Sequence, residues 1–367
     1  MRAALEQSWR GKGRTSPRPS VGCVLVRDGQ IVGAGHTQRG DGQPHGEVMA
    51  IRDAWRRDPR IGPRGSTAYV TLEPCSHFGT TPPCCDALRR EGIVRVVAGV
   101  LDPDPRVAGR GFRNLRRMGI EVVQSPLARE CFAAMDEFLF HVVQKRPFVT
   151  LKLAASLDGK IALPSGESQW ISGEESRRHA HILRHHADAV LVGIETVLAD
   201  DPTLSVRLEG DFTQPARIVL DSLARTPLDA KIWHDAPALL IFVSSDAPAT
   251  RVQALLERGA QVVEIGADAG GFLRWDEILG ALYERQIVSV LVEGGARVAG
   301  SALRAGIVNK IAHFAAPKIL GAGRAAIAGF EVETLADAPQ LELVAHTVLG
   351  QDVLFEGYLA PLPLKFV

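Results

Sequence analysis

The sequence predicts two consecutive α/β domains. The chain has 367 residues, which exceeds the roughly 100–200 residues of a typical single domain. Apolar runs of strand length alternate with helix-like segments in both halves. Near the middle, Lys145-Arg146-Pro147 follows an apolar helical segment, and proline disfavours helical continuation through the residue before it. We therefore predict one domain over residues 1–144 and a second over residues 147–367.

The composition is that of a globular protein and restricts its partners. Hydrophobic residues make up 46% of the chain and charged residues 23%. The formal net charge is zero, which argues against a nucleic-acid-binding surface. The sequence shows no signal-peptide core and no apolar run of about twenty residues, so we expect no membrane association. Five cysteines without a disulfide pattern favour a reducing compartment, and we expect the cytoplasm.

The pattern of the first half predicts a sheet with interspersed helices. A hairpin is predicted around Asp28-Gly29, because this turn pair separates two strand-like runs. The predicted strands are 21–26, 31–35, 67–72 and 94–100, and the predicted helices are 47–57, 84–91 and 132–143.

Metal-ligand residues cluster at helix starts in this half. His45 opens one helix, Cys75 follows a strand, and Cys84 opens another helix after two prolines. One imidazole and two thiolates at this spacing form a three-ligand zinc site. Three protein ligands leave the fourth zinc position open for water, as in catalytic rather than structural sites. We therefore predict His45, Cys75 and Cys84 as ligands of Zn2+.

A carboxylate stands beside these ligands. Glu47 lies two residues past His45 and is the predicted proton carrier between water and a leaving amine. A His-x-Glu followed by a Pro-Cys and a second Cys is the pattern of zinc-dependent deaminases. We expect Cys85 to point away from the metal, and Cys23 and Cys131 to be core residues.

The second half alternates strands and helices again. Its predicted strands are 148–153, 189–192, 216–220, 238–242, 261–265 and 288–292, in an order that the sequence does not determine. After the last of these strands, Gly294-Gly295 precedes a helix. This turn is either a phosphate cradle at a helix N-terminus or a tight turn that needs glycine for its backbone angles.

Other polar residues of the second half allow two interpretations each, one functional and one structural. Asp200-Asp201-Pro202 is either a loop carrying a functional acid or a solvated turn. Arg184 and Arg207 either bind an anionic substrate or are solvated surface residues.

Longer motifs give these residues a context. In the first half they are 71–77 (TLEPCSH), 81–85 (TPPCC) and 102–111 (DPDPRVAGRG); in the second they are 152–160 (KLAASLDGK), 165–172 (SGESQWIS), 196–202 (TVLADDP), 293–295 (EGG) and 316–321 (APKILG). Over nearly its whole length the chain closely resembles the bifunctional deaminase–reductases of riboflavin biosynthesis, in the same domain order.

This resemblance implies a fold and two activities. The first domain would be a cytidine-deaminase-like three-layer zinc domain, and the second a dihydrofolate-reductase-like domain. The first would deaminate a diaminopyrimidinone ribosyl phosphate by zinc-assisted hydrolysis. The second would use NADPH to reduce C1′ of the ribosyl group. The implied partners are a phosphorylated pyrimidine and further copies of the chain, without nucleic acid or membrane.

The resemblance also carries site residues to this chain. The implied cofactor contacts in the second domain are Ala154, Trp170, Thr196, Asp200, Ser222, Gly295, Ala296, Arg297 and Ser301. The implied substrate contacts are Ser168, Arg184, Leu204, Arg207 and Glu293. Asp200 and Lys152 are candidates for proton transfer during reduction.

Three positions of the first domain depart from the family pattern. Arg18 replaces the usual asparagine of Pro-Asn-Pro, which is expected to hydrogen-bond the pyrimidine. Gly46 replaces the alanine of His-Ala-Glu, at a cost of up to about 1 kcal/mol in helix propensity. Thr80 replaces a basic residue that would contact the substrate phosphate.

These departures allow three interpretations. Arg18, with Arg10, Lys12 and Arg14 nearby, would compensate for the missing base at position 80. Alternatively, the deaminase is slow or specialised beside a normal reductase. In the third interpretation the first domain is only a zinc-stapled scaffold, but Glu47, which a structural site does not need, argues against that.

Overall fold

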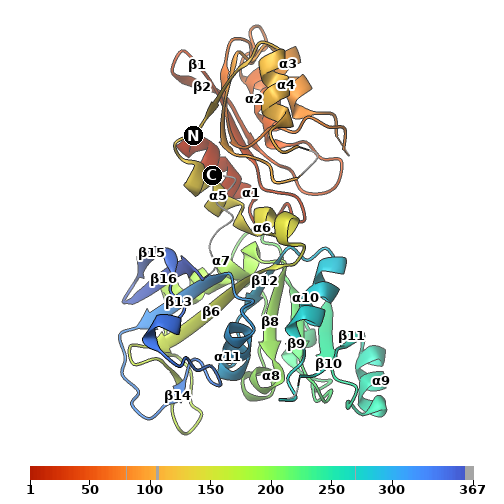
Figure 1. Cartoon of the computed structure of the whole chain (residues 1–367), viewed down its shortest axis with the longest axis vertical. Helices are drawn as coiled ribbons and strands as arrows, with labels where there is room; N and C mark the ends of the chain where they lie inside the picture. The colour runs from red at the N-terminus through yellow and green to blue at the C-terminus, as the bar shows by residue number, and fades with distance from the viewer. Residues whose placement is uncertain (80, 105–106, 269, 360–367) are drawn as a thin grey trace. The chain divides into compact units, whose positions relative to one another are not determined.

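The computed structural model in Figure 1 describes residues 1–79, 81–104, 107–268 and 270–359. These residues form two compact units, one spanning Met1–Lys145 and the other beginning at Arg146. No helix within the described ranges combines the length and the apolar character that a bilayer crossing requires.

A five-stranded sheet forms the centre of the first unit, in the order β2-β1-β3-β4-β5. Its strands are β1 (Gly22–Arg27), β2 (Gln30–His36), β3 (Thr67–Leu72), β4 (Arg95–Val100) and β5 (Glu121–Gln124). β1 pairs antiparallel with β2 and β3, whereas β3, β4 and β5 run parallel. The parallel strands therefore end at one edge of the sheet, where the segments that follow β3 and β4 emerge together.

Helices complete a three-layer arrangement around this sheet (Figure 1). They are α1 (Arg2–Gly11), α2 (Gly46–Arg57), α3 (Cys84–Arg90), α4 (Arg110–Arg117), α5 (Ala128–Ala134) and α6 (Asp136–Gln144). α1 and α5 pack together on the sheet, while α2, α3 and α4 form the second helical layer. Glycine in β2 allows α2 to pack close to the sheet: a Cβ at Gly33 would lie 2.2 Å from the Ala50 carbonyl oxygen of α2.

The second unit is built on a nine-stranded sheet in the order β11-β10-β9-β8-β12-β6-β13-β16-β15. The strands are β6 (Phe148–Ser156), β8 (Ala189–Gly193), β9 (Ala216–Leu220), β10 (Leu239–Val243), β11 (Gln261–Glu264), β12 (Ser289–Val292), β13 (Lys310–Ala316), β15 (Glu342–Leu349) and β16 (Asp352–Tyr358). The first seven strands in the sheet order are parallel, and β16 and β15 add an antiparallel edge. A small second sheet pairs β7 (Lys160–Ala162) with β14 (Arg324–Ala325).

Each face of the large sheet is apolar, which explains why its strands read as continuous hydrophobic runs. On one face, Leu191 and Val290 pack with residues of α10 (Trp275–Glu284) and α11 (Ala296–Arg304). On the other, Val190 and Leu291 pack with residues of α7 (Glu174–His186), α8 (Ile194–Asp200) and α9 (Ala249–Arg258). Two short 3-10 helices cover Lys231–Trp233 and Leu335–Asp337.

The structure confirms the α/β class and every predicted strand to within three residues at each end. One prediction was wrong: 132–143 is not a single helix, because the chain breaks between α5 and α6 at Met135, whose φ is −135°. The antiparallel edge formed by β13, β16 and β15 was not predicted, since its strands mix polar and apolar residues without strict alternation.

Candidate functional sites

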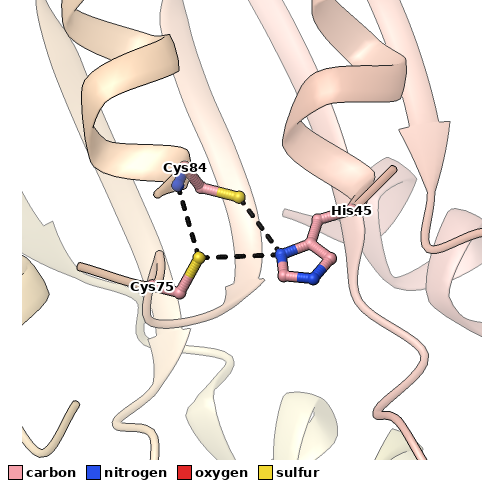
Figure 2. Close-up of side chains that lie close together, drawn as sticks. All are labelled: His45, Cys75 and Cys84. Carbon is pink, nitrogen blue, oxygen red and sulfur yellow. Dashed lines mark hydrogen bonds between the residues drawn. The ribbon is translucent and has the colours of Figure 1, made fainter. Parts of the chain in front are cut away.

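The three predicted metal ligands converge in the first unit. His45 is the N-cap of α2, Cys84 is the first residue of α3, and Cys75 lies in the loop after β3. Figure 2 shows the two sulfurs turned toward one imidazole nitrogen. His45 Nδ1 lies 3.6 Å from Cys75 Sγ and 3.3 Å from Cys84 Sγ. All three ligand atoms lie within 4.8 Å of one another.

This geometry fits a zinc ion. Zn–S and Zn–N bonds of about 2.3 and 2.0 Å at tetrahedral angles place sulfur and nitrogen about 3.5 Å apart. The two observed separations fall on either side of that distance. Two thiolates and one imidazole are also a donor set that zinc prefers. The residues present therefore suit zinc in both chemistry and spacing.

Local hydrogen bonds favour the thiolate form of Cys75. The pKa of Cys75 falls to about 4, because hydrogen bonds from the Cys84 thiol and from His45 stabilise its charge despite burial. The backbone N–H of Cys84, at the start of α3, donates to Cys75 Sγ over 3.3 Å. A deprotonated thiol is the form that binds a metal.

Glu47 lies in the first turn of α2 and is 3% exposed. Among the described residues, its Oε2 has no hydrogen-bond partner. Burial raises the pKa of Glu47 above its usual value, and the charge of Cys75 acts in the same direction. A buried, unpartnered carboxylate oxygen beside a metal site is suited to exchanging protons with a bound water or substrate.

The remaining cysteines lie where expected. Cys23 and Cys131 are fully buried, and none of the five cysteines, all of them described, forms a disulfide. Cys85 Sγ is directed to the carbonyl oxygens of Pro74 and Gly111, at 3.4 and 3.7 Å. Cys85 therefore does not join the cluster of ligands.

Arg18 is engaged with a neighbouring turn of the first unit. Its guanidinium donates to the carbonyl oxygens of Gln38, Gly40 and Gln43, the last over 2.9 Å. A phosphate contact by Arg18 would require these bonds to be given up. Lys12 is engaged too: its Nζ lies 3.2 Å from Asp136 and 2.7 Å from Glu137, and its side chain is 8% exposed. Thr80 lies outside the described residues.

In the second unit, three predicted site residues form one ionic cluster. Arg184 of α7 donates from Nε and Nη2 to the two carboxylate oxygens of Glu293, which follows β12. Lys152 of β6 places its Nζ 3.8 Å from the same carboxylate. Burial lowers the pKa of Lys152 below its usual value, although Glu293 acts in the opposite direction.

Most predicted reductase residues lie at or near the carboxyl ends of the parallel strands. Lys152 and Ala154 are in β6, Thr196 follows β8, Ser222 follows β9 and Glu293 follows β12. β12 lies between β6 and β8 in the sheet although it comes much later in the chain. Ligands of open α/β sheets bind at the carboxyl edge where the strand order reverses in this way.

The turn after β12 forms a close-fitting backbone cradle. A Cβ at Gly294 would lie 2.8 Å from the Val192 side chain and 3.0 Å from Thr196 Oγ1. Gly295 has a φ of +70°, and α11 begins at the next residue, Ala296. The first backbone N–H groups of a helix have no intrahelical partner and attract anions. The backbone therefore meets the requirement for glycine at this turn and also forms a helix N-terminus of the kind that binds anions.

The other predicted contacts are more dispersed. Trp170 is 60% exposed, and Arg207 is exposed. Leu204 is buried with a φ of +52°, and Ser301 is buried and accepts a hydrogen bond from Trp275 Nε1 over 3.0 Å. Ser168 is half-buried, and Arg297 is exposed. Asp200 is the last residue of α8, and among the described residues no hydrogen bond or ion pair joins it to Lys152.

Sequence reasoning did not find the residues that support these contacts. The ring of His181 lies beside the loop that carries Leu204 and Arg207: its Nδ1 is 3.1 Å from the Ser205 carbonyl oxygen. Lys318 donates to the Trp170 carbonyl oxygen over 2.5 Å, and the Arg177 guanidinium lies 4.5 Å from the Trp170 ring centre. Lone basic residues on a helix or loop carry no sequence signal for such roles.

Two family models match the chain, one in each unit. Residues 1–100 match the cytidine and deoxycytidylate deaminase zinc-binding region. Residues 147–355, more than half of the chain, match the RibD C-terminal domain. The chain belongs to the RibD family.

Relatives of this family match nearly the full length. The riboflavin biosynthesis protein RibD of Aquifex aeolicus is 41% identical over 362 residues, covering 98% of both chains. The RibD of Escherichia coli is 41% identical over 372 residues, covering 96% of both. A solved deaminase/reductase structure from Thermotoga maritima has 35% identity and a TM-score of 0.84, covering 98% of this chain and 97% of its own.

Membership confirms the predicted fold class and function. The chain is a bifunctional deaminase–reductase of riboflavin biosynthesis, with a cytidine-deaminase-like domain followed by a RibD-type reductase domain. Its cofactors are Zn2+ in the first domain and NADPH in the second.

Proposed function

We propose that the chain converts one phosphorylated pyrimidine in two steps, by deamination in a domain spanning 1–144 and reduction in a domain spanning 147–367. The substrate of the first step is 2,5-diamino-6-(5-phosphoribosylamino)pyrimidin-4-one, and the product of that step is the substrate of the reductase. The support is the full-length match to a solved deaminase/reductase whose two named activities are these steps. The observation that carries the deaminase half is the His45–Cys75–Cys84 cluster with Glu47 beside it.

In the first step a C–O bond forms at the amine-bearing ring carbon and the C–N bond breaks, so that ammonia leaves. When bound, zinc supplies a Lewis acid that lowers the pKa of water toward 7. Glu47 accepts the proton of the attacking water on Oε2 and returns it to the departing amine. The raised pKa of Glu47 suits both directions of this transfer. The step involves no oxidant or reductant.

In the second step NADPH supplies the hydride that reduces C1′ of the ribosyl group. We propose that Lys152, with Asp200 as a second candidate, handles the accompanying proton. Lys152 is supported by its lowered pKa and by its place beside Glu293 at the carboxyl edge of the sheet.

Substrate binding falls to residues at the same edge of the sheet. Arg207 is assigned to the phosphate, because Arg184 has its Nε and Nη2 donors on Glu293 and Nη1 on the Ser205 carbonyl oxygen. The remaining proposed substrate contacts are Ser168, Arg184, Leu204 and Glu293. The proposed NADPH contacts are Ala154, Trp170, Thr196, Asp200, Ser222, Gly295, Ala296, Arg297 and Ser301.

We further propose that the chain acts in the cytoplasm as a homo-oligomer assembled through its second domain. β15 is an edge strand of the large sheet, and its Val344 and Val348 side chains are 52% and 68% exposed. An exposed edge strand with apolar side chains favours pairing with another chain. Sedimentation equilibrium measures this state, and a monomer at micromolar concentration would contradict it.

The experiment that tests the assignment of the deaminase step is Glu47→Ala in the full chain. We expect the variant to lose ammonia release while it keeps its zinc content and its NADPH oxidation on pre-deaminated substrate. Ammonia release at the wild-type rate would show that Glu47 is not the proton carrier.

A further inference from the structure

Glu73 immediately precedes the metal-ligand segment Pro74-Cys75, and the proposed mechanism gives it no part. It is 3% exposed, and both of its carboxylate oxygens accept hydrogen bonds from backbone N–H groups. Oε2 accepts from Asp102 over 3.3 Å and from Gly109 over 2.9 Å, and Oε1 accepts from Phe112 over 3.2 Å. One buried side chain therefore binds the backbone at residues 102, 109 and 112.

The described residues that follow β4, 102–104 and 107–112, come close to Pro74 for topological reasons. β3 and β4 are parallel neighbours with Leu72 opposite Val100, so the chain leaves both strands at the same edge of the sheet. The backbone N–H of Glu73 still pairs with the Val100 carbonyl oxygen over 2.8 Å. After this bond the two strands no longer pair, and the Glu73 side chain binds the backbone that follows β4.

The segment also packs directly on the residue before Cys75. A Cβ at Gly111 would lie 2.2 Å from the Pro74 carbonyl oxygen and 3.0 Å from Glu73 Oε1. Gly109 has a φ of +78°, in the left-handed region that favours glycine. The glycines at 109 and 111 therefore allow the backbone to approach the Glu73 carboxylate. This explains why the 102–111 motif contains these glycines, although it supplies no metal ligand.

We propose that Glu73 is a positioning residue of the deaminase site, which fixes residues 102–104 and 107–112 against Pro74-Cys75 and so sets one wall of the substrate site. This inference rests on the proposed deaminase function. Hydrogen bonds to an ionised carboxylate are roughly twice as strong as those between neutral groups. A neutral amide at position 73 would also present an NH2 group to backbone donors and leave one of them unpaired.

The test is Glu73→Gln in the full chain, with Glu121→Gln as the matched control. Glu121 makes an ion pair with Arg95 on the same sheet, but its side chain is 61% exposed. We expect Glu73→Gln to raise the KM of ammonia release by about tenfold, the equivalent of one lost charge-assisted hydrogen bond. Zinc content and NADPH oxidation on pre-deaminated substrate stay at wild-type values, and Glu121→Gln changes none of these.

Hydrogen exchange reports on the positioning without relying on activity. In Glu73→Gln the amides of Asp102, Gly109 and Phe112 exchange faster, while those of α2 keep their wild-type rates. Unchanged exchange and unchanged KM overturn the proposal. Loss of zinc together with faster exchange throughout the first unit also overturns it, in favour of a general structural role. If the wild-type chain itself releases no ammonia, the proposed function fails, and the exchange result still decides the role of Glu73.

Discussion

Arg184 and Glu293 form a two-point ion pair across 109 residues of sequence. Nε and Nη2 of Arg184 lie 2.5 and 2.9 Å from the two oxygens of Glu293, and the side chains are 13% and 5% exposed. Burial alone would raise the pKa of Glu293, but the charge of Arg184 and its hydrogen bonds lower it to about 2. Two residues that the family resemblance assigns separately to the substrate therefore act as one unit, with Lys152 beside them.

Glu293→Gln tests how much this cluster stabilises the second domain. The change leaves the Arg184 and Lys152 cations largely buried beside each other without a counter-charge. Removing one partner of a buried ion pair costs about 3–5 kcal/mol. We expect urea denaturation to show a loss of this size in the free energy of unfolding. The control is Glu195→Gln: Glu195 pairs with Arg225, but its side chain is 64% exposed, so we expect almost no loss. Equal stability of the two variants would contradict the account.

His181 makes the stability of the second domain sensitive to acid. Burial and the charges of Arg184 and Arg207 lower the pKa of His181 to about 4. Below an ordinary histidine pKa of about 6.5 the unfolded chain binds a proton that the folded chain does not, so stability falls between pH 6.5 and 4. We expect His181→Asn to lose less stability than the wild type over this window in thermal denaturation. Parallel losses would show that His181 does not titrate in this way.

Arg207→Ala tests the proposed phosphate contact. Arg207 is exposed, and its Nη1 donates to Thr203 Oγ1 over 2.7 Å, so the guanidinium keeps further donors for a ligand. Loss of a charge-assisted contact of about 1.5–3 kcal/mol predicts a rise of about 10- to 100-fold in the reductase KM, with a smaller change in kcat. Arg225→Ala, which removes an exposed arginine from an ion pair, serves as the control. An unchanged KM would show that Arg207 is a solvated surface residue that does not contact the phosphate.

Gly46→Ala tests whether the departure at position 46 is forced by packing. Helix propensity alone predicts that alanine stabilises α2 by up to about 1 kcal/mol. In the structure a Cβ at position 46 would lie 2.4 Å from the Val21 carbonyl oxygen. We therefore expect Gly46→Ala to destabilise the first domain. Gly280→Ala, in α10 with nothing within 4 Å of its Cβ, should instead stabilise the second domain. The same sign for both variants would contradict the packing argument.

The sequence predicted best what motifs of residue type and spacing determine. His45, Cys75 and Cys84 were predicted to ligate one metal because their residue types and spacing form a zinc-ligand motif, and the structure brings them together. The pairing of Arg184 with Glu293 depends on β12 inserting between β6 and β8, an order that no local pattern encodes. The role of Glu73 was missed because its partners are backbone amides, which carry no side-chain signal in the sequence.

The contacts of Arg18 could likewise not be predicted without the fold. As a sequence departure it suggested either a phosphate contact or an impaired site. In the structure its guanidinium lies on three carbonyl oxygens of the turn that precedes His45. The metal ligands converge despite this substitution, so an effect of Arg18 on deamination would appear in the activity and not in the zinc content.

Ammonia release from the diaminopyrimidinone ribosyl phosphate by the zinc-loaded chain, with NADPH withheld, tests the central claim most directly. We predict release at a rate typical of an enzyme, because the ligand cluster and Glu47 are in place. No release, with NADPH still oxidised when the deaminated intermediate is supplied, would contradict the account. The chain would then be a reductase joined to an inactive zinc domain.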